Sequence, residues 1–292
     1  MPVVIPEHST GSVFEGRRSS VGAILGYFAL TYVITWTLWA MSARVGNGAT
    51  GAGALQPLQI LLLYLGTFTP GLLALALTFR SEGRTGVRAL LGRLIQGNVA
   101  LGYYAFALGY MFALKLTAAV VHRVAFGSWP AFGHDPWFLM FVAAIFSTLV
   151  GGQAGEELGW RGYALPRLTS RMGLGPASLL LGVIWASWHL PLFFIRAADT
   201  RGQSFPLYLA QVTAVSVAMA WLYWRTKGSL LLTMLLHASI NNTKDVVPSH
   251  VLGATSVFAL STSRVAWITV ALLWVTALYF LVDMRKARIS GT

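Results

Sequence analysis

Long apolar stretches dominate this chain, and short polar segments separate them. Each stretch runs for about 20 residues, the length at which a helix crosses the hydrocarbon core of a bilayer at about 1.5 Å per residue. The pattern predicts an all-α polytopic membrane protein with about eight transmembrane helices. The expected spans are Val21–Ala43, Pro57–Phe79, Val99–Val121, Trp137–Gly155, Ala177–Ile195, Pro206–Trp224, Ser229–Val247 and Val265–Val282.

The polar segments give the domain organisation. Residues 1–20 are expected to form a cytoplasmic tail, residues 21–284 a single membrane domain, and residues 285–292 a basic cytoplasmic tail. No repeat or second soluble domain is visible in the sequence. Between the second and third spans, residues 80–98 interleave arginines with apolar side chains, a pattern typical of an amphipathic helix on a headgroup surface.

Composition narrows the class further. Hydrophobic residues make up 56% of the chain and charged residues only 10%, whereas a soluble domain carries about 25% charged residues. The chain has no cysteine, which excludes disulfides and thiol chemistry. The net charge is +12, and the basic residues flank the apolar spans. Membrane topology and attraction to anionic headgroups explain this distribution better than nucleic-acid binding does. The expected partner is the lipid bilayer, and no nucleic acid is expected.

The distribution of basic residues predicts the orientation. With eight spans and an internal N-terminus, 14 lysines and arginines fall inside and six outside. Positive charge accumulates on the cytoplasmic side of membrane proteins, so both termini are expected in the cytoplasm. Arginine is strongly preferred over lysine, which indicates a GC-rich prokaryotic genome. We therefore expect a multi-pass integral protein of a prokaryotic plasma (inner) membrane.

Two adjacent carboxylates, Glu156 and Glu157, follow the fourth expected span, with Arg161 shortly after them. An acidic side chain at membrane depth costs several kcal/mol unless it has a partner, which makes the pair a functional-site hypothesis. Glu157 precedes Arg161 by four residues, the favourable order for a helical ion pair. We expect that pair to be structural or to orient the substrate. Glu156 is then the chemically free carboxylate.

Three further polar residues are expected at membrane depth. His189 lies in the fifth span, and His237 and Asn241 lie one helical turn apart in the seventh. A single intramembrane histidine is most often a packing residue. Polar groups on three spans must all be satisfied without water, which favours a shared polar site. Glycines at every fourth position of the motif helix predict a close helix contact: Gly151, Gly155 and Gly159.

The order of these motifs resembles the CPBP family of intramembrane proteases. The matching elements are Glu156-Glu157-x-x-x-Arg161, Trp185-x-x-x-His189 and His237-x-x-x-Asn241. The family includes the type II CAAX prenyl endopeptidases (Rce1-like) and the Abi proteins of bacteriocin processing and immunity. The resemblance places the core at about residues 138–245. Trp185 stands where the pattern usually has phenylalanine, which keeps an aromatic side chain.

The resemblance implies an intramembrane endopeptidase. Glu156 and His189 would activate the attacking water, and His237 and Asn241 would stabilise the oxyanion. Desolvation strengthens a carboxylate as a base, which suits Glu156 to that role. Trp185 would orient the substrate or support the structure. The implied substrate is a membrane-anchored peptide or protein, in the prenyl-protease branch a prenylated CAAX-type one.

A zinc protease would use the same residues, with Glu156, His189 and His237 as ligands and one open water position. The sequence has no His-Glu-x-x-His pair, and Asn241 suits an oxyanion donor better than a ligand. We therefore favour a mechanism that requires no cofactor, with Zn as the alternative. The other open readings are a non-catalytic membrane scaffold or bacteriocin-immunity protein, and a transporter or haem protein.

Overall fold

The computed structural model describes residues 20–47, 56–131, 139–195, 198–243, 246–247 and 253–289. The expected tail at residues 1–20 lies outside this part except for its last residue, as do residues 290–292 of the expected C-terminal tail. Within the described part the regular structure is entirely helical. The elements are α2 (Val21–Asn47), α3 (Pro57–Gly92), η1 (Arg93–Ile95), α4 (Leu101–Phe126), α5 (Leu139–Val150), α6 (Gln153–Glu157), η2 (Leu158–Ala164), α7 (Leu165–Met172), α8 (Leu174–Trp188), η3 (Leu190–Phe194), α9 (Phe205–Arg225), α10 (Leu230–Asn242) and α11 (Arg264–Ile289).

Six segments of the described residues are long and apolar enough to cross a membrane: Val21–Gly46, Pro57–Ile95, Leu101–Phe126, Leu174–Phe194, Phe205–Arg225 and Arg264–Arg285. The predicted class, an all-α polytopic membrane protein, is confirmed. The other two expected spans correspond to shorter helices, since α5 has 12 residues and α10 has 13. A 13-residue helix is only about 20 Å long, less than the hydrocarbon thickness of about 30 Å.

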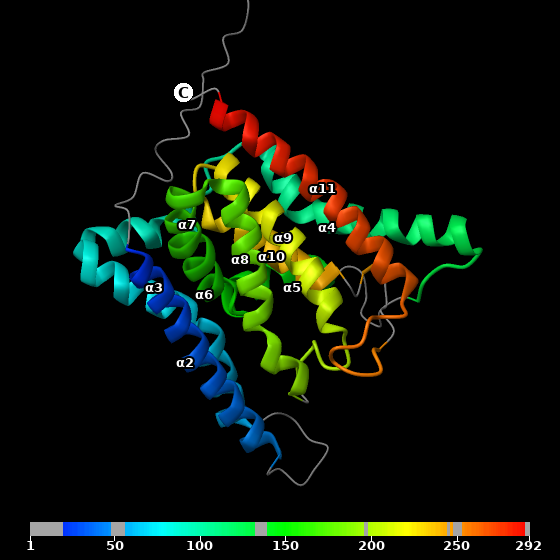
Figure 1. Ribbon diagram of the computed structural model, residues 1–292, viewed down its shortest axis with the longest axis horizontal. Coiled ribbons are helices and arrows are strands. Elements are labelled where there is room, and N and C mark those ends of the chain that lie inside the picture. Colours follow the sequence, from blue (N-terminus) through cyan, green and yellow to red (C-terminus); the bar gives the residue numbers. More distant parts are fainter. Residues whose placement is uncertain are drawn as a thin grey trace, which may run out of the picture.

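Helix α10 occupies the centre of the bundle (Figure 1). It packs against α4, α5, α6 and α9, and α9 in turn packs against α8 and α11. Helices α2 and α3 lie side by side at one flank, and α3 contacts α6 and η2. The short helices α6 and α10 therefore lie among longer ones, and this arrangement places the polar motifs inside the protein.

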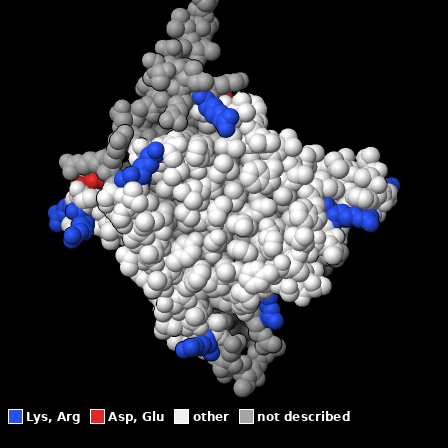
Figure 2. All heavy atoms as spheres, viewed as in Figure 1, with Lys and Arg blue, Asp and Glu red and all other residues white. Residues whose placement is uncertain are grey.

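The outer surface of the bundle is largely apolar. In Figure 2 the few lysines and arginines lie near the margins of a face on which most atoms belong to uncharged residues. Large side chains on the long helices are strongly exposed, for example Val33 of α2, Val124 of α4 and Val275 of α11. In water such a surface would drive aggregation, whereas in a bilayer it faces lipid.

Helix α3 contains a proline that α2 compensates. Pro70 has no N–H to donate to the carbonyl of Gly66, one turn earlier. The Thr35 hydroxyl donates to that carbonyl at 3.0 Å, and the Tyr27 hydroxyl donates to the carbonyl of Pro70 at 3.2 Å. The two helices are thus joined by polar contacts that each satisfy a buried backbone oxygen.

The motif segment packs against this part of α3. Gly152 adopts a left-handed conformation (φ 93°), which interrupts the helix between α5 and α6. A Cβ on Gly155 would lie 2.9 Å from Cα of Phe68, and a Cβ on Gly159 would lie 2.5 Å from Cβ of Pro70. The predicted close contact is therefore present at Gly155 and Gly159. Gly151 belongs to neither helix, because α5 ends at Val150 and α6 begins at Gln153.

Candidate active site

Glu156 lies at the centre of a polar group inside the bundle. It is the fourth residue of α6, and only 7% of it is exposed. Its Oε2 accepts a hydrogen bond from the indole Nε1–H of Trp185 at 2.8 Å and lies 3.9 Å from Nε2 of His189. The sequence motifs on α6 and at the end of α8 thus meet in space.

His189 is positioned by the end of α8. Pro191 cannot continue the helix, because it lacks an N–H and its ring clashes with the preceding turn. The α-helix therefore ends at Trp188, and His189 forms the junction with η3 inside the apolar segment Leu174–Phe194. The Trp36 indole of α2 donates at 2.9 Å to the carbonyl of Trp188, which the ending helix leaves available.

The hydrogen bonds of His189 define its tautomer. Nδ1 lies 2.8 Å from the carbonyl oxygen of Trp185, which can only accept, so Nδ1 carries the proton. In the neutral ring Nε2 is then an acceptor, and this atom faces Glu156. Two acceptors 3.9 Å apart do not bond to each other, but both can accept a hydrogen from one water molecule.

Glu157 is the centre of a second polar group, which adjoins the first at the Trp185 ring. Its Oε1 accepts from Nη1 of Arg161 at 2.8 Å and from Nδ1 of His237 at 3.0 Å. Glu157 and Arg161 are fully buried, and the Arg161 guanidinium lies 4.2 Å from the centre of the Trp185 ring. The expected ion pair is present. All residues of the π-helical turn η2, which carries Arg161, are buried.

His237 binds a different carboxylate from the one expected. The zinc alternative placed His237 beside Glu156 and His189, whereas its Nδ1 contacts Glu157. Successive helical residues point about 100° apart, so the rotation of α6 decides which carboxylate reaches α10. The Trp185 ring lies between the two groups, 5.1 Å from the His237 ring and 5.7 Å from the His189 ring.

Asn241 is placed at the edge of this site. Its side chain is exposed at the end of α10. With the Gln153 amide oriented to satisfy its own hydrogen bonds, Asn241 Nδ2 donates to the Gln153 oxygen at 3.3 Å. Asn241 is therefore connected to α6, although its contact is with Gln153 and not with Glu156 or His189.

Two residues of the site were missed by the sequence reasoning. Gln153 lies three residues before Glu156, a spacing that places both on one side of α6 and was available as a signal. Tyr208 of α9 has its ring 5.6 Å from the His189 ring, and no motif in α9 indicated it. Trp185 was expected to orient the substrate or support the structure, and its hydrogen bond to Glu156 was not foreseen.

The zinc alternative does not fit the observed arrangement. A catalytic zinc site needs three protein ligands around one point. Across the described ranges, no three histidine, aspartate, glutamate or cysteine side chains are grouped so that they could hold a metal ion. His237 directs Nδ1 to Glu157, and His189 directs Nδ1 to a backbone carbonyl. Zinc-bound histidines make the same kind of contact through the nitrogen that does not bind the metal, so the conclusion rests on the missing three-ligand grouping within the described residues. We therefore derive no step through a metal.

Comparison with known proteins finds a family match over the part of the chain that carries the motifs. Residues 135–243 match the family model described as type II CAAX prenyl endopeptidase Rce1-like. A protein of Methanococcus maripaludis named CAAX prenyl protease 2 is 26% identical over 231 residues, covering 76% of this chain and 83% of the relative. The resemblance to the CAAX prenyl protease family is confirmed. The family match ends at Thr243 and includes α6, η2, α8 and α10, the elements that carry all three motifs.

Proposed function

We propose that this chain is an intramembrane endopeptidase that hydrolyses a peptide bond of a membrane-anchored, prenylated CAAX-type substrate. The observation that carries the proposal is the pairing of Glu156 with His189 across 3.9 Å, with acceptor atoms facing each other. The family resemblance supports the protease class, and the name of the archaeal relative supports the substrate class.

The reaction needs a base, a nucleophile and a proton donor. A water that donates one hydrogen to Glu156 and the other to His189 presents its lone pair to a peptide carbonyl. Glu156 takes one proton as the oxygen attacks, and the carbonyl becomes a tetrahedral oxyanion. Glu156 then returns this proton to the leaving amine, and the C–N bond breaks. Trp185 donates to Glu156 Oε2 and so fixes the orientation of the base.

The oxyanion is assigned to α10. With Nδ1 of His237 bound to Glu157, its Nε2 is the atom available to a substrate. An imidazolium on this carboxylate would donate through Nε2, and Glu157 would stabilise its charge. Asn241 lies one turn further along α10, so its amide is the second donor once a substrate displaces the contact with Gln153. Each donor of this type lowers the activation barrier by about 3–4 kcal/mol.

A cleavage assay tests the substrate class. Purified protein in lipid vesicles is expected to cut a farnesylated CAAX-type peptide at least about tenfold faster than the same peptide without the prenyl group, because apolar burial favours the anchored form by about 0.8 kcal/mol per CH₂. A palmitoylated copy of the peptide is the matched control for anchoring alone. Equal rates on all three peptides would contradict the proposal.

Removal of divalent metals tests the mechanism separately. Because Glu156 and His189 hold the water without a metal in this proposal, activity is expected to stay within about twofold after treatment with a strong chelator and dialysis. The measurement is the initial rate on the best peptide, with a known zinc peptidase treated in parallel. Loss of activity that zinc alone restores would favour the metal mechanism.

A further inference from the structure

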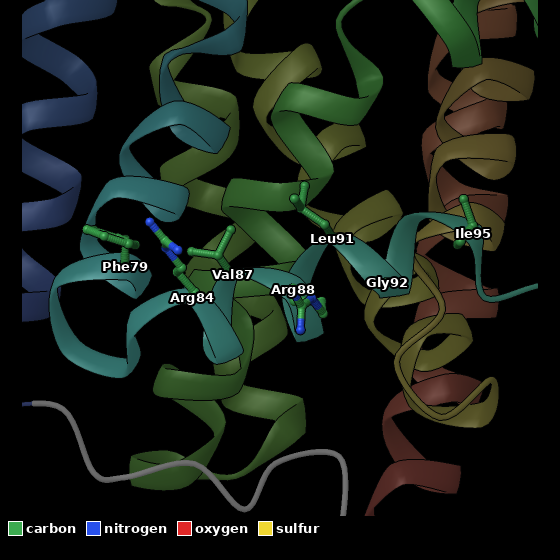
Figure 3. Close-up of a pocket in the computed structure, with 7 residues that line it drawn as sticks. All are labelled: Phe79, Arg84, Val87, Arg88, Leu91, Gly92 and Ile95. Carbon is green, nitrogen blue, oxygen red and sulfur yellow. The ribbon is translucent and has the colours of Figure 1, made fainter.

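A groove outside the active site lies along the last turns of α3. Its volume is about 590 Å³, within the range of about 300–1,000 Å³ for ligand pockets. Seven residues line it: Phe79, Arg84, Val87, Arg88, Leu91, Gly92 and Ile95. Figure 3 shows Phe79 and Arg84 toward one end and Ile95 at the other.

The groove exists because α3 bends. Gly83 has φ 64° and ψ −159°, a conformation available essentially only to glycine. The 27 residues from Pro57 to Gly83 are about 40 Å long, more than enough to cross the hydrocarbon core. The helix beyond Gly83 therefore leaves the direction of the span, and Phe79 from before the bend forms one wall with residues from after it.

This segment lies at the level of the helix ends. Gln96, just after it, donates through Nε2 to the carbonyls of Thr226 and Lys227 at 3.2 Å. Those residues form the turn between α9 and α10. Arg225, beside the turn, lies 3.9 Å from Asp283 near the end of α11. Three helix ends meet here, and the ends of helices long enough to span a bilayer are expected near its headgroups.

The lining combines positive charge with apolar surface in two rows. Arg84 and Arg88 are one turn apart, and Val87, Leu91 and Ile95 follow the same spacing beside them. Both arginines are exposed, and neither makes a hydrogen bond or ion pair within the described part of the chain. Leu91 is 40% exposed and Ile95 is 82% exposed. Such a surface matches an anion attached to an aliphatic chain.

The opposite side of the same helical segment packs on the motif segment. Leu90 is buried, and its Cδ1 lies 2.7 Å from where a Cβ on Gly162 would be. Gly162 follows Arg161 directly in η2. A ligand in the groove therefore contacts a helix that supports the turn carrying the buried ion pair.

We propose that this groove binds one anionic phospholipid, with the headgroup phosphate on Arg84 and Arg88 and an acyl chain along Val87, Leu91 and Ile95. Charge complementarity and headgroup depth select this occupant over a peptide. An arginine near an anionic lipid contributes about a factor of five in affinity, so the two together give about 25-fold.

The test is lipid binding to the full chain in detergent, measured by native mass spectrometry. The wild type is expected to bind phosphatidylglycerol about 25-fold more tightly than phosphatidylcholine. The R84Q/R88Q variant should lose this preference, and R84K/R88K should retain most of it. The matched control R80Q/R285Q removes two exposed arginines that do not line the groove and should bind like the wild type.

Three results would overturn the proposal. One is an equal affinity of the wild type for both lipids. Another is an equal loss of affinity in R84Q/R88Q and in R80Q/R285Q, which would indicate attraction to the whole basic surface. The third is competition by glycerol phosphate as strong as that by the lipid, which would indicate a site for soluble anions without a contribution from the acyl chain.

Discussion

Replacing Glu156 with glutamine is expected to lower the rate of peptide hydrolysis about 100- to 10,000-fold, the contribution typical of a general base. Glutamine keeps the size of the side chain, and its amide oxygen can still accept from the Trp185 indole. It cannot take a proton from water. The substitution therefore removes the chemical step while it leaves the surrounding contacts in place.

The measurement is kcat on a saturating concentration of lipidated peptide, together with the thermal stability of the same samples. Glu82→Gln is the matched control, because it makes the same chemical change at a carboxylate that pairs with Arg167 and is 48% exposed in its side chain. We expect that control to retain activity within about threefold, since exposed ion pairs contribute only about 0–1 kcal/mol. If Glu156→Gln were as active as this control, the base would have to be another residue.

Replacing Arg161 with methionine is expected to destabilise the protein by about 3–5 kcal/mol, the usual cost of leaving one member of a buried ion pair unpaired. Both members of the pair are fully buried, and their contact of 2.8 Å is closer than the second contact that Glu157 makes with His237. Methionine fills much of the same volume, so the loss of stability would reflect the missing charge rather than a cavity.

A second variant separates charge from packing. Glu157→Gln combined with Arg161→Met removes the unpaired carboxylate, keeps an acceptor for His237, and should recover at least half of the lost stability. Arg225→Met is the matched control, because Arg225 is 43% exposed in its side chain and 3.9 Å from its partner Asp283, and it should cost about 1 kcal/mol or less. Chemical denaturation in detergent micelles provides the comparison. A loss below about 1 kcal/mol for Arg161→Met would show that water or another group compensates for the missing guanidinium.

The sequence by itself determined the class and the identity of the motifs. Apolar runs of membrane-spanning length need no tertiary information to be recognised, because the bilayer requires each segment to satisfy its own backbone. The fold class followed from this rule. The ion pair of Glu157 with Arg161 was also predictable, since residues four apart in a helix are neighbours.

Helix ends and breaks were less predictable. The left-handed Gly152 divides the fourth expected span, and Pro191 ends α8 one residue before His189. Glycine tolerates both helical and left-handed conformations, so its presence alone did not indicate a break. The seventh expected span is also shorter in the structure, because α10 ends at Asn242.

The partners of the two carboxylates were decided only by the tertiary structure. Glu156 and Glu157 are adjacent and chemically identical, and the sequence does not state how α6 is rotated. The close packing of Gly155 and Gly159 on α3 sets that rotation. As a result Glu156 faces Trp185 and His189, while Glu157 faces His237. A sequence motif identifies the side chains of a site, but only the packing of the helices determines which of these side chains are in contact.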